Sequence, residues 1–169
     1  MNATRYHASA ARTRPPRSYR DLLLMAALGI GGESGEVLAT TTSDTANTRD
    51  HRIKELGDVC WYVALMADML GMDAEALWVP TFDAVIVTWH GGAIRVSIEA
   101  GGVVEAVKKH LYHEKGIAPV QAALSRLTTA IYLAGLTIDA DLPEVWAANI
   151  EKLDGRHPKG WSADYRSDL

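Results

Sequence analysis

Two short acidic segments carry the residue types and spacing best suited to chemistry. Glu33 and Glu36 stand three residues apart in the first segment. Glu55 and Asp58 repeat that spacing in the second. Residues three apart share one face of a helix, so two antiparallel helices would bring all four carboxylates together. A folded protein tolerates such crowding mainly when a cation lies between the acids, and oxygen ligands predict Mg²⁺ or Mn²⁺ rather than zinc.

The alternative is that each pair lies on a solvated helix face, which is the usual place for surface acids. The flanking sequence argues against it. The apolar run 22–30 precedes the first pair, and the apolar residues of 59–65, all except Tyr62, follow the second. Acids placed this close to core residues are hard to leave fully exposed, which favours a metal site.

These segments carry a family resemblance. Residues 27–37 and 54–64 resemble the E-x-x-E and E-x-x-D signature of MazG-like nucleoside triphosphate pyrophosphohydrolases. Near the C-terminus, residues 148–153 and 156–161 are similar to the closing stretch of many members. The similarity extends from about residue 21 to residue 161, with an interruption in the middle.

The resemblance implies a helical enzyme that hydrolyses a (deoxy)nucleoside triphosphate to the monophosphate and pyrophosphate. It implies Mg²⁺ or Mn²⁺, two or more ions per site, and metal-binding and catalytic roles for Glu33, Glu36, Glu55 and Asp58. Candidate substrates are dGTP, dUTP and dCTP, with a phage-type member that removes dGTP as one possibility. Members commonly form dimers or tetramers, and exposed aromatic residues near the C-terminus would suit such an interface. These are Trp146, Trp161 and Tyr165.

Further residues are candidates for substrate binding. Trp61 follows Asp58 by three residues and could reach a base, although a core tryptophan is the commoner role. Asn149 could read a base edge or satisfy a helix end. The remaining candidates are basic residues that could contact phosphates or simply be surface charges, namely Lys108, Lys109, Lys152 and Arg156.

Composition limits the fold and the compartment. A chain of 169 residues with 48% hydrophobic content predicts one soluble domain, and abundant Ala and Leu with a single Phe favour helices. The net charge of −4 argues against binding to a nucleic-acid polymer. The lone Cys60 among apolar neighbours predicts a buried thiol in a reducing compartment. With no signal-peptide pattern and no apolar run long enough to cross a membrane, the cytoplasm is expected, or the host cytoplasm for a phage protein.

The order of motifs predicts an all-α bundle of five to seven helices built from two related halves. A short helix in the Arg-rich start precedes a helix capped by Ser18, and residues 18–78 form the metal-binding half. Residues 92–161 form a degenerate repeat in which only Glu99 survives of the four acids. The other three places hold Gly102, Ser125 and Thr128.

Two alternatives remain open at this stage. The stretch 83–90 is apolar and β-branched and would, taken alone, suit a strand. The chain could also be a non-catalytic helical regulatory or assembly module with a vestigial acidic site. The intact acids of the first half count against that second possibility, because the second half shows how such a site degenerates.

Overall fold

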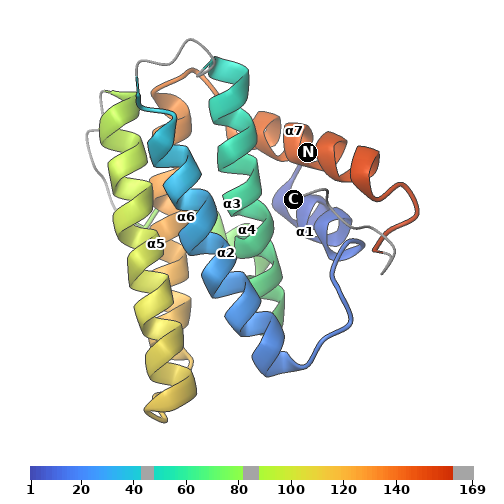
Figure 1. The fold of residues 1–169 in the computed structure, drawn as a ribbon, viewed down its shortest axis with the longest axis vertical. Coiled ribbons are helices and arrows are strands. Elements are labelled where there is room, and N and C mark those ends of the chain that lie inside the picture. Colours follow the sequence, from blue (N-terminus) through green and yellow to red (C-terminus); the bar gives the residue numbers. More distant parts are fainter. Residues whose placement is uncertain (43–47, 82–87, 162–169) are drawn as a thin grey trace.

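The computed structural model describes residues 1–42, 48–81 and 88–161. Within these ranges the chain is helical and contains no strand, which confirms the predicted all-α bundle (Figure 1). The helices are α1 (Ala3–Ala11), α2 (Tyr19–Ala39), α3 (Arg49–Met69), α4 (Ala74–Leu77), α5 (Trp89–Tyr112), α6 (Ala118–Leu136) and α7 (Leu142–Arg156). Most of the stretch considered for a strand lies outside the described residues, and Trp89 begins α5.

Four long helices form the core as two hairpins, α2 with α3 and α5 with α6. α2 packs between α3 and α5, while α6 packs on α5 and α3. The first hairpin lies within residues 18–78, and the second contains most of the region 92–161 that was predicted to form a degenerate repeat; the repeat itself stays a prediction. α7 and α1 pack together on α3, and α7 also contacts α6 (Figure 1). Cys60 is fully buried in this core, and burial raises the pKa of its thiol, as expected of a structural cysteine.

Local sequence signals set the helix ends. The Ser18 side chain accepts a hydrogen bond from the Asp21 backbone N–H and so caps α2 as predicted. Gly71 follows the end of α3 with φ of +63°, a left-handed conformation that glycine adopts without strain. Asp73 then caps the short α4 through its side chain.

By length and composition, α2 is apolar enough to cross a membrane, with a mean hydropathy of 1.4 over an 18-residue window. The fold gives it a different role. Leu23 and Ile30 of this helix are fully buried, and α2 packs against α3 and α5. Glu33 and Glu36 lie on the same helix, one half-exposed and one exposed. α2 is thus a core helix of the bundle.

One part of the interface prediction was wrong. Trp146 is buried, with 4% of its surface exposed, because its ring stacks on Tyr6 of α1 at 5.4 Å between centroids. Trp161 is partly exposed, and Tyr165 lies outside the described residues. Large apolar side chains that do face outward include Leu28 on α2 and Ile98 on α5.

Gly101 provides a test of the exposed side of α5. It lies in the middle of this helix, its surface is exposed, and a Cβ atom added there would meet nothing within 4 Å. Gly101→Ala is therefore expected to raise the free energy of unfolding by about 0.5–1 kcal/mol, since alanine is the better helix former. Urea denaturation measures the change. A loss of stability would contradict the open space on this side of α5.

Candidate functional site

Three of the four predicted acids meet between α2 and α3, which run antiparallel (Figure 1). Glu33, Glu55 and Asp58 each contribute a carboxylate oxygen, and these oxygens lie within 4.8 Å of one another. This group is called the acid cluster below. Glu36 lies outside the cluster, one turn further along α2, where it is exposed. It lines a cavity that opens beside the cluster.

Crowding of like charges is visible in the pKa values. Burial, followed by the charges of Asp58, Glu36 and Glu55, raises the pKa of Glu33 to about 7. Burial and the neighbouring Asp58 also raise the pKa of Glu55. Without a cation, the acid cluster thus resists full ionisation at neutral pH.

Glu55 carries the most informative atom of the cluster. The residue is only 8% exposed, and its Oε2 atom is buried without a hydrogen-bond partner among the described residues. A buried carboxylate oxygen normally has a donor or a cation beside it. An all-oxygen donor set with one unsatisfied buried oxygen fits a hard divalent cation such as Mg²⁺ or Mn²⁺.

Helix α7 supplies polar groups opposite the acids. Asn149 donates from Nδ2 to Asp58 Oδ1 at 3.2 Å, and Lys152 forms an ion pair with Asp58 Oδ2. This close approach depends on Gly57, where a Cβ atom would lie 2.9 Å from Asn149 Cβ. Asn149 sits within α7 and is 1% exposed, so it does not satisfy a helix end.

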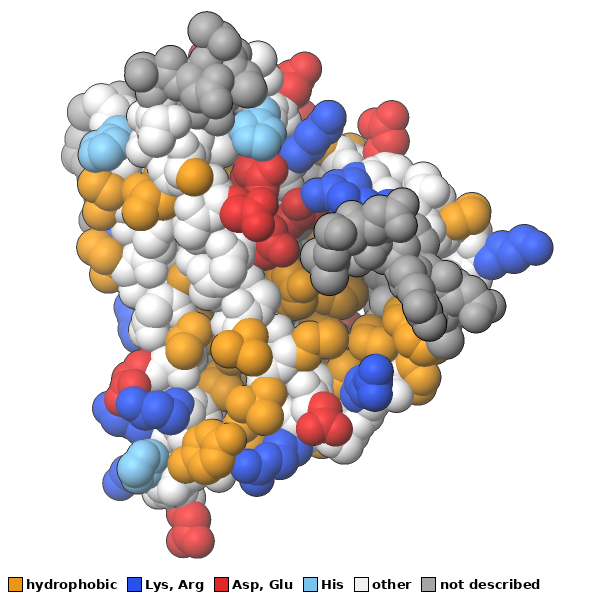
Figure 2. Space-filling model, viewed as in Figure 1, with side chains coloured by type: hydrophobic (Ala, Val, Ile, Leu, Met, Phe, Trp, Pro, Cys, Tyr) orange, Lys and Arg blue, Asp and Glu red, His pale blue; other side chains and the backbone are white. Residues whose placement is uncertain are grey.

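A cavity of about 470 Å³ opens beside the acid cluster. Its acidic and basic side is formed by α2, α3 and α7, and its apolar side includes Trp61, Tyr62 and Met25. Figure 2 shows acidic side chains on this face directly above a group of hydrophobic ones. The other lining residues are Thr13, Pro15, Glu33, Glu36, Asp58, Asn149, Lys152, Leu153, Arg156, His157 and Trp161.

The cavity therefore brings together most of the predicted substrate-binding residues. Trp61 lines it, although its indole N–H is already engaged with the Thr13 hydroxyl at 2.8 Å. Asn149 and Lys152 line it beside Asp58, and Arg156 is exposed at its edge. A tryptophan ring and two cationic side chains, those of Lys152 and Arg156, therefore line one cavity.

Lys108 and Lys109 are not among the residues that line this cavity. Lys109 lies in the last turn of α5 and Lys108 directly precedes that turn. Both form ion pairs with Glu105, with Lys109 Nζ 3.3 Å from Glu105 Oε1. These pairs lower the pKa of Glu105. The two lysines are exposed surface charges of the second hairpin, the alternative role considered for them.

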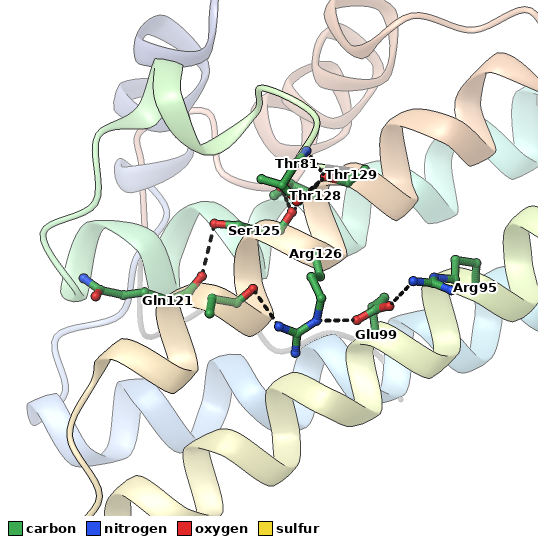
Figure 3. A network of polar contacts seen from close by, with 9 residues as sticks. Thr81, Arg95, Glu99, Gln121, Ser125, Arg126, Thr128 and Thr129 are labelled. Carbon is green, nitrogen blue, oxygen red and sulfur yellow. Dashed lines mark hydrogen bonds and ion pairs between the residues drawn. The ribbon is translucent and has the colours of Figure 1, made fainter. Parts of the chain in front are cut away.

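In the second hairpin, the one acid that the predicted repeat retains, Glu99, is paired with arginine side chains. Glu99 is 7% exposed, and its two oxygens accept from Arg95 Nη2 at 2.7 Å and Arg126 Nε at 3.1 Å (Figure 3). Ser125 and Thr128 donate to backbone carbonyls at Gln121 and Leu77. Both Glu99 oxygens have partners within the protein, in contrast to Glu55 Oε2. This position therefore has no free carboxylate oxygen for a cation among the described residues, whereas the acid cluster has one.

Two contributors to the site were missed. Tyr62 follows Trp61 and lies four residues after Asp58, a spacing that places it on the same side of α3. That signal was available in the sequence. Tyr6, which hydrogen-bonds to Asn149 from α1, has no comparable signal because it lies 143 residues away in sequence.

The raised pKa of Glu33 predicts how stability changes with pH in metal-free protein. The folded state keeps a proton that the unfolded state loses, so stability is full below about pH 4.5 and falls as pH rises to about 7. We expect a loss of about 1–2 kcal/mol, after allowing for solvent screening at this half-exposed group. Groups with a lowered pKa, such as Glu144, change the stability only at pH values below this range.

Urea denaturation in EDTA at pH 5 and pH 8 measures this effect. Glu33→Gln should reduce the difference between the two pH values and should be more stable than the unchanged chain at pH 8. Equal pH dependence in both proteins would contradict the charge crowding described for the acid cluster.

No protein-family model, curated protein or solved structure matches the chain. The resemblance to MazG-like pyrophosphohydrolases therefore depends on the sequence motifs alone. The acid cluster and its cavity are structural features that do not depend on this resemblance.

Proposed function

We propose that the chain is a metal-dependent nucleotide pyrophosphohydrolase that converts a (deoxy)nucleoside triphosphate to its monophosphate and pyrophosphate. The observation that carries this proposal is the acid cluster, with its unsatisfied Glu55 Oε2 atom, beside a cavity lined by cationic and aromatic side chains. The motif resemblance supports the same reaction. dGTP, dUTP and dCTP remain the candidate substrates.

Glu33, Glu55 and Asp58 would hold Mg²⁺ or Mn²⁺, with Glu36 available as a further oxygen ligand at the exposed side. A divalent ion in such a site neutralises phosphate charge and activates water. The site would hold more than one ion, because acids from α2 and α3 line the same cavity. The four acids are the proposed catalytic and metal-binding residues.

The protein's own cations would hold the rest of the substrate. Lys152 is ion-paired with Asp58 and lines the cavity, and Arg156 is exposed at its edge. Both could contact phosphate oxygens through charge-assisted hydrogen bonds. The rings of Trp61 and Tyr62 offer an apolar surface to a base, and their edge-to-face packing at 4.7 Å restrains both.

The reaction itself is a balanced hydrolysis. The oxygen of one water molecule bonds to the α-phosphorus, and the bond from this phosphorus to the bridging oxygen breaks. The bridging oxygen leaves with pyrophosphate. Excess protons pass to solvent or to a carboxylate of the site, and no oxidant or further reactant is needed.

The competing proposal is a helical regulatory or assembly module whose acids have no catalytic role. Two features favour the enzyme over this module: the Glu55 oxygen without a partner among the described residues, and the open cavity. A vestigial site is expected to resemble Glu99, whose two oxygens are both paired within the protein. The two proposals differ in whether nucleotides are turned over.

The deciding experiment is a panel of common and deoxynucleoside triphosphates with Mg²⁺ or Mn²⁺, with products separated by ion-exchange chromatography. Monophosphate and pyrophosphate in equal amounts, abolished by EDTA, are expected. Diphosphate and phosphate would indicate cleavage at the γ-phosphate. Absence of turnover with every nucleotide would favour the regulatory module.

A further inference from the structure

Asp58 is the acid held most firmly by the rest of the protein. Both of its oxygens are engaged by α7, Oδ1 by the Asn149 amide and Oδ2 by Lys152. Lys152 is a flexible side chain at the cavity, whereas Asn149 is 1% exposed and immobilised by packing. The Asn149 contact is therefore the one that fixes the direction of the Asp58 carboxylate.

The chemistry of that contact defines the orientation of the Asn149 amide. An ionised carboxylate only accepts hydrogen bonds, so the NH₂ group of Asn149 must face Asp58. The amide oxygen then points the opposite way, towards α1. There it accepts from the Tyr6 hydroxyl at 3.0 Å, and Tyr6 is the donor of this pair.

Tyr6 is well placed to keep that orientation. Its side chain is fully buried, and its ring lies parallel to the Trp146 ring at 5.4 Å, with an interplanar angle of 11°. Burial raises the pKa of the phenol, so the hydroxyl retains the proton that it donates. The hydroxyl therefore has little freedom to turn away from Asn149.

We propose that Tyr6 is a positioning residue that acts through Asn149 to hold Asp58 in its metal-binding direction. Without the hydroxyl, the Asn149 oxygen loses its buried donor, and the amide is free to turn and present oxygen to the carboxylate. This inference rests on the proposed metal-binding role of the acid cluster. It gives α1, which contributes no acid to the cluster, a defined part in the site.

The test is Mn²⁺ binding to the full chain, measured from the electron paramagnetic resonance signal of free Mn²⁺. Tyr6→Phe keeps the ring and its stacking on Trp146 but removes the donor. We expect it to weaken Mn²⁺ binding about tenfold, the size typical of an outer partner of a metal ligand. In an Asn149→Ala background the same substitution should change binding no further.

Ala10→Gly is the matched control. Ala10 is a buried residue of α1 that takes no part in the chain of hydrogen bonds, and glycine loosens the same helix. It should lower the urea midpoint at least as much as Tyr6→Phe and leave Mn²⁺ affinity unchanged. An equal loss of affinity in this control would reduce Tyr6 to a packing residue.

The outcomes separate this inference from the proposed function. If Mn²⁺ binds and Asp58→Asn abolishes binding, the metal site stands, and unchanged affinity in Tyr6→Phe overturns only the role of Tyr6. If the unchanged chain shows no Mn²⁺ binding that depends on Asp58, both proposals fail together.

Discussion

Asparagine in place of Asp58 is expected to lower nucleotide hydrolysis at least about 100-fold while leaving the fold intact. The substitution keeps the shape of the side chain and an oxygen for Asn149 to donate to, but it removes the negative charge that a divalent cation requires. The variant should stay folded, because relief of the repulsion within the crowded acid cluster offsets the loss of the ion pair with Lys152. Steady-state hydrolysis and Mn²⁺ binding measure the effect.

Asp50→Asn is the matched control for this experiment. Asp50 lies in the first turn of the same helix, is exposed, and is not part of the acid cluster. The activity of this variant should stay within about twofold of that of the unchanged chain. Its free energy of unfolding should fall by at most a few tenths of a kcal/mol, because a favourable interaction with the helix dipole is lost. Full activity in Asp58→Asn would remove the acid cluster from the catalytic mechanism.

Glu36→Gln tests the position of the remaining acid. Glu36 raises the pKa of Glu33 and of Glu55 but lies outside the three-acid cluster. Its replacement should therefore cost less activity than Asp58→Asn. An equal loss would indicate that Glu36 turns inward to bind the cation when substrate is present.

Local patterns were enough to predict the elements that carry the site. The Ser18 cap and the three-residue spacing of the acids depend on neighbours within a few residues, so the sequence alone indicates them. The convergence of Glu33, Glu55 and Asp58 followed from one further assumption, antiparallel packing, which the fold confirms.

Features that depend on long-range packing could not be predicted in the same way. Trp146 was expected at the surface because tryptophan suits interfaces, yet α1 folds back and covers it with Tyr6. Asn149 was considered for base reading or a helix end; its base-reading role stays a prediction, and its side chain links Asp58, 91 residues away, to Tyr6. Lys108 and Lys109 were candidates for phosphate contact because of their charge, which says nothing about which end of a helix faces the cavity. In each case the missing information was the position of α1, α5 or α7 relative to the acids.

Gly57→Ala is expected to combine a loss of stability with a loss of activity that stability alone does not explain. A Cβ atom at this position would lie 2.9 Å from Asn149 Cβ and 3.3 Å from the Val145 carbonyl oxygen. Neither is the end of a flexible side chain, so α7 must move away from α3. Overpacking of this kind costs about 1–3 kcal/mol, of which the better helix propensity of alanine returns up to about 1 kcal/mol.

The displacement of α7 matters more for chemistry than for folding. Asn149 and Lys152 both contact Asp58 from this helix. A shift of about 1 Å would break the contact of Asn149, whose side chain is immobilised by packing, whereas the longer Lys152 side chain can follow. Misplacement on that scale can cost about 100-fold in rate. Gly101→Ala, which meets no neighbour, is the control for a glycine-to-alanine change in a helix. Hydrolysis assays under conditions where both variants remain folded then separate the two effects. Normal activity in a destabilised Gly57→Ala protein would show that close contact between α3 and α7 serves packing alone.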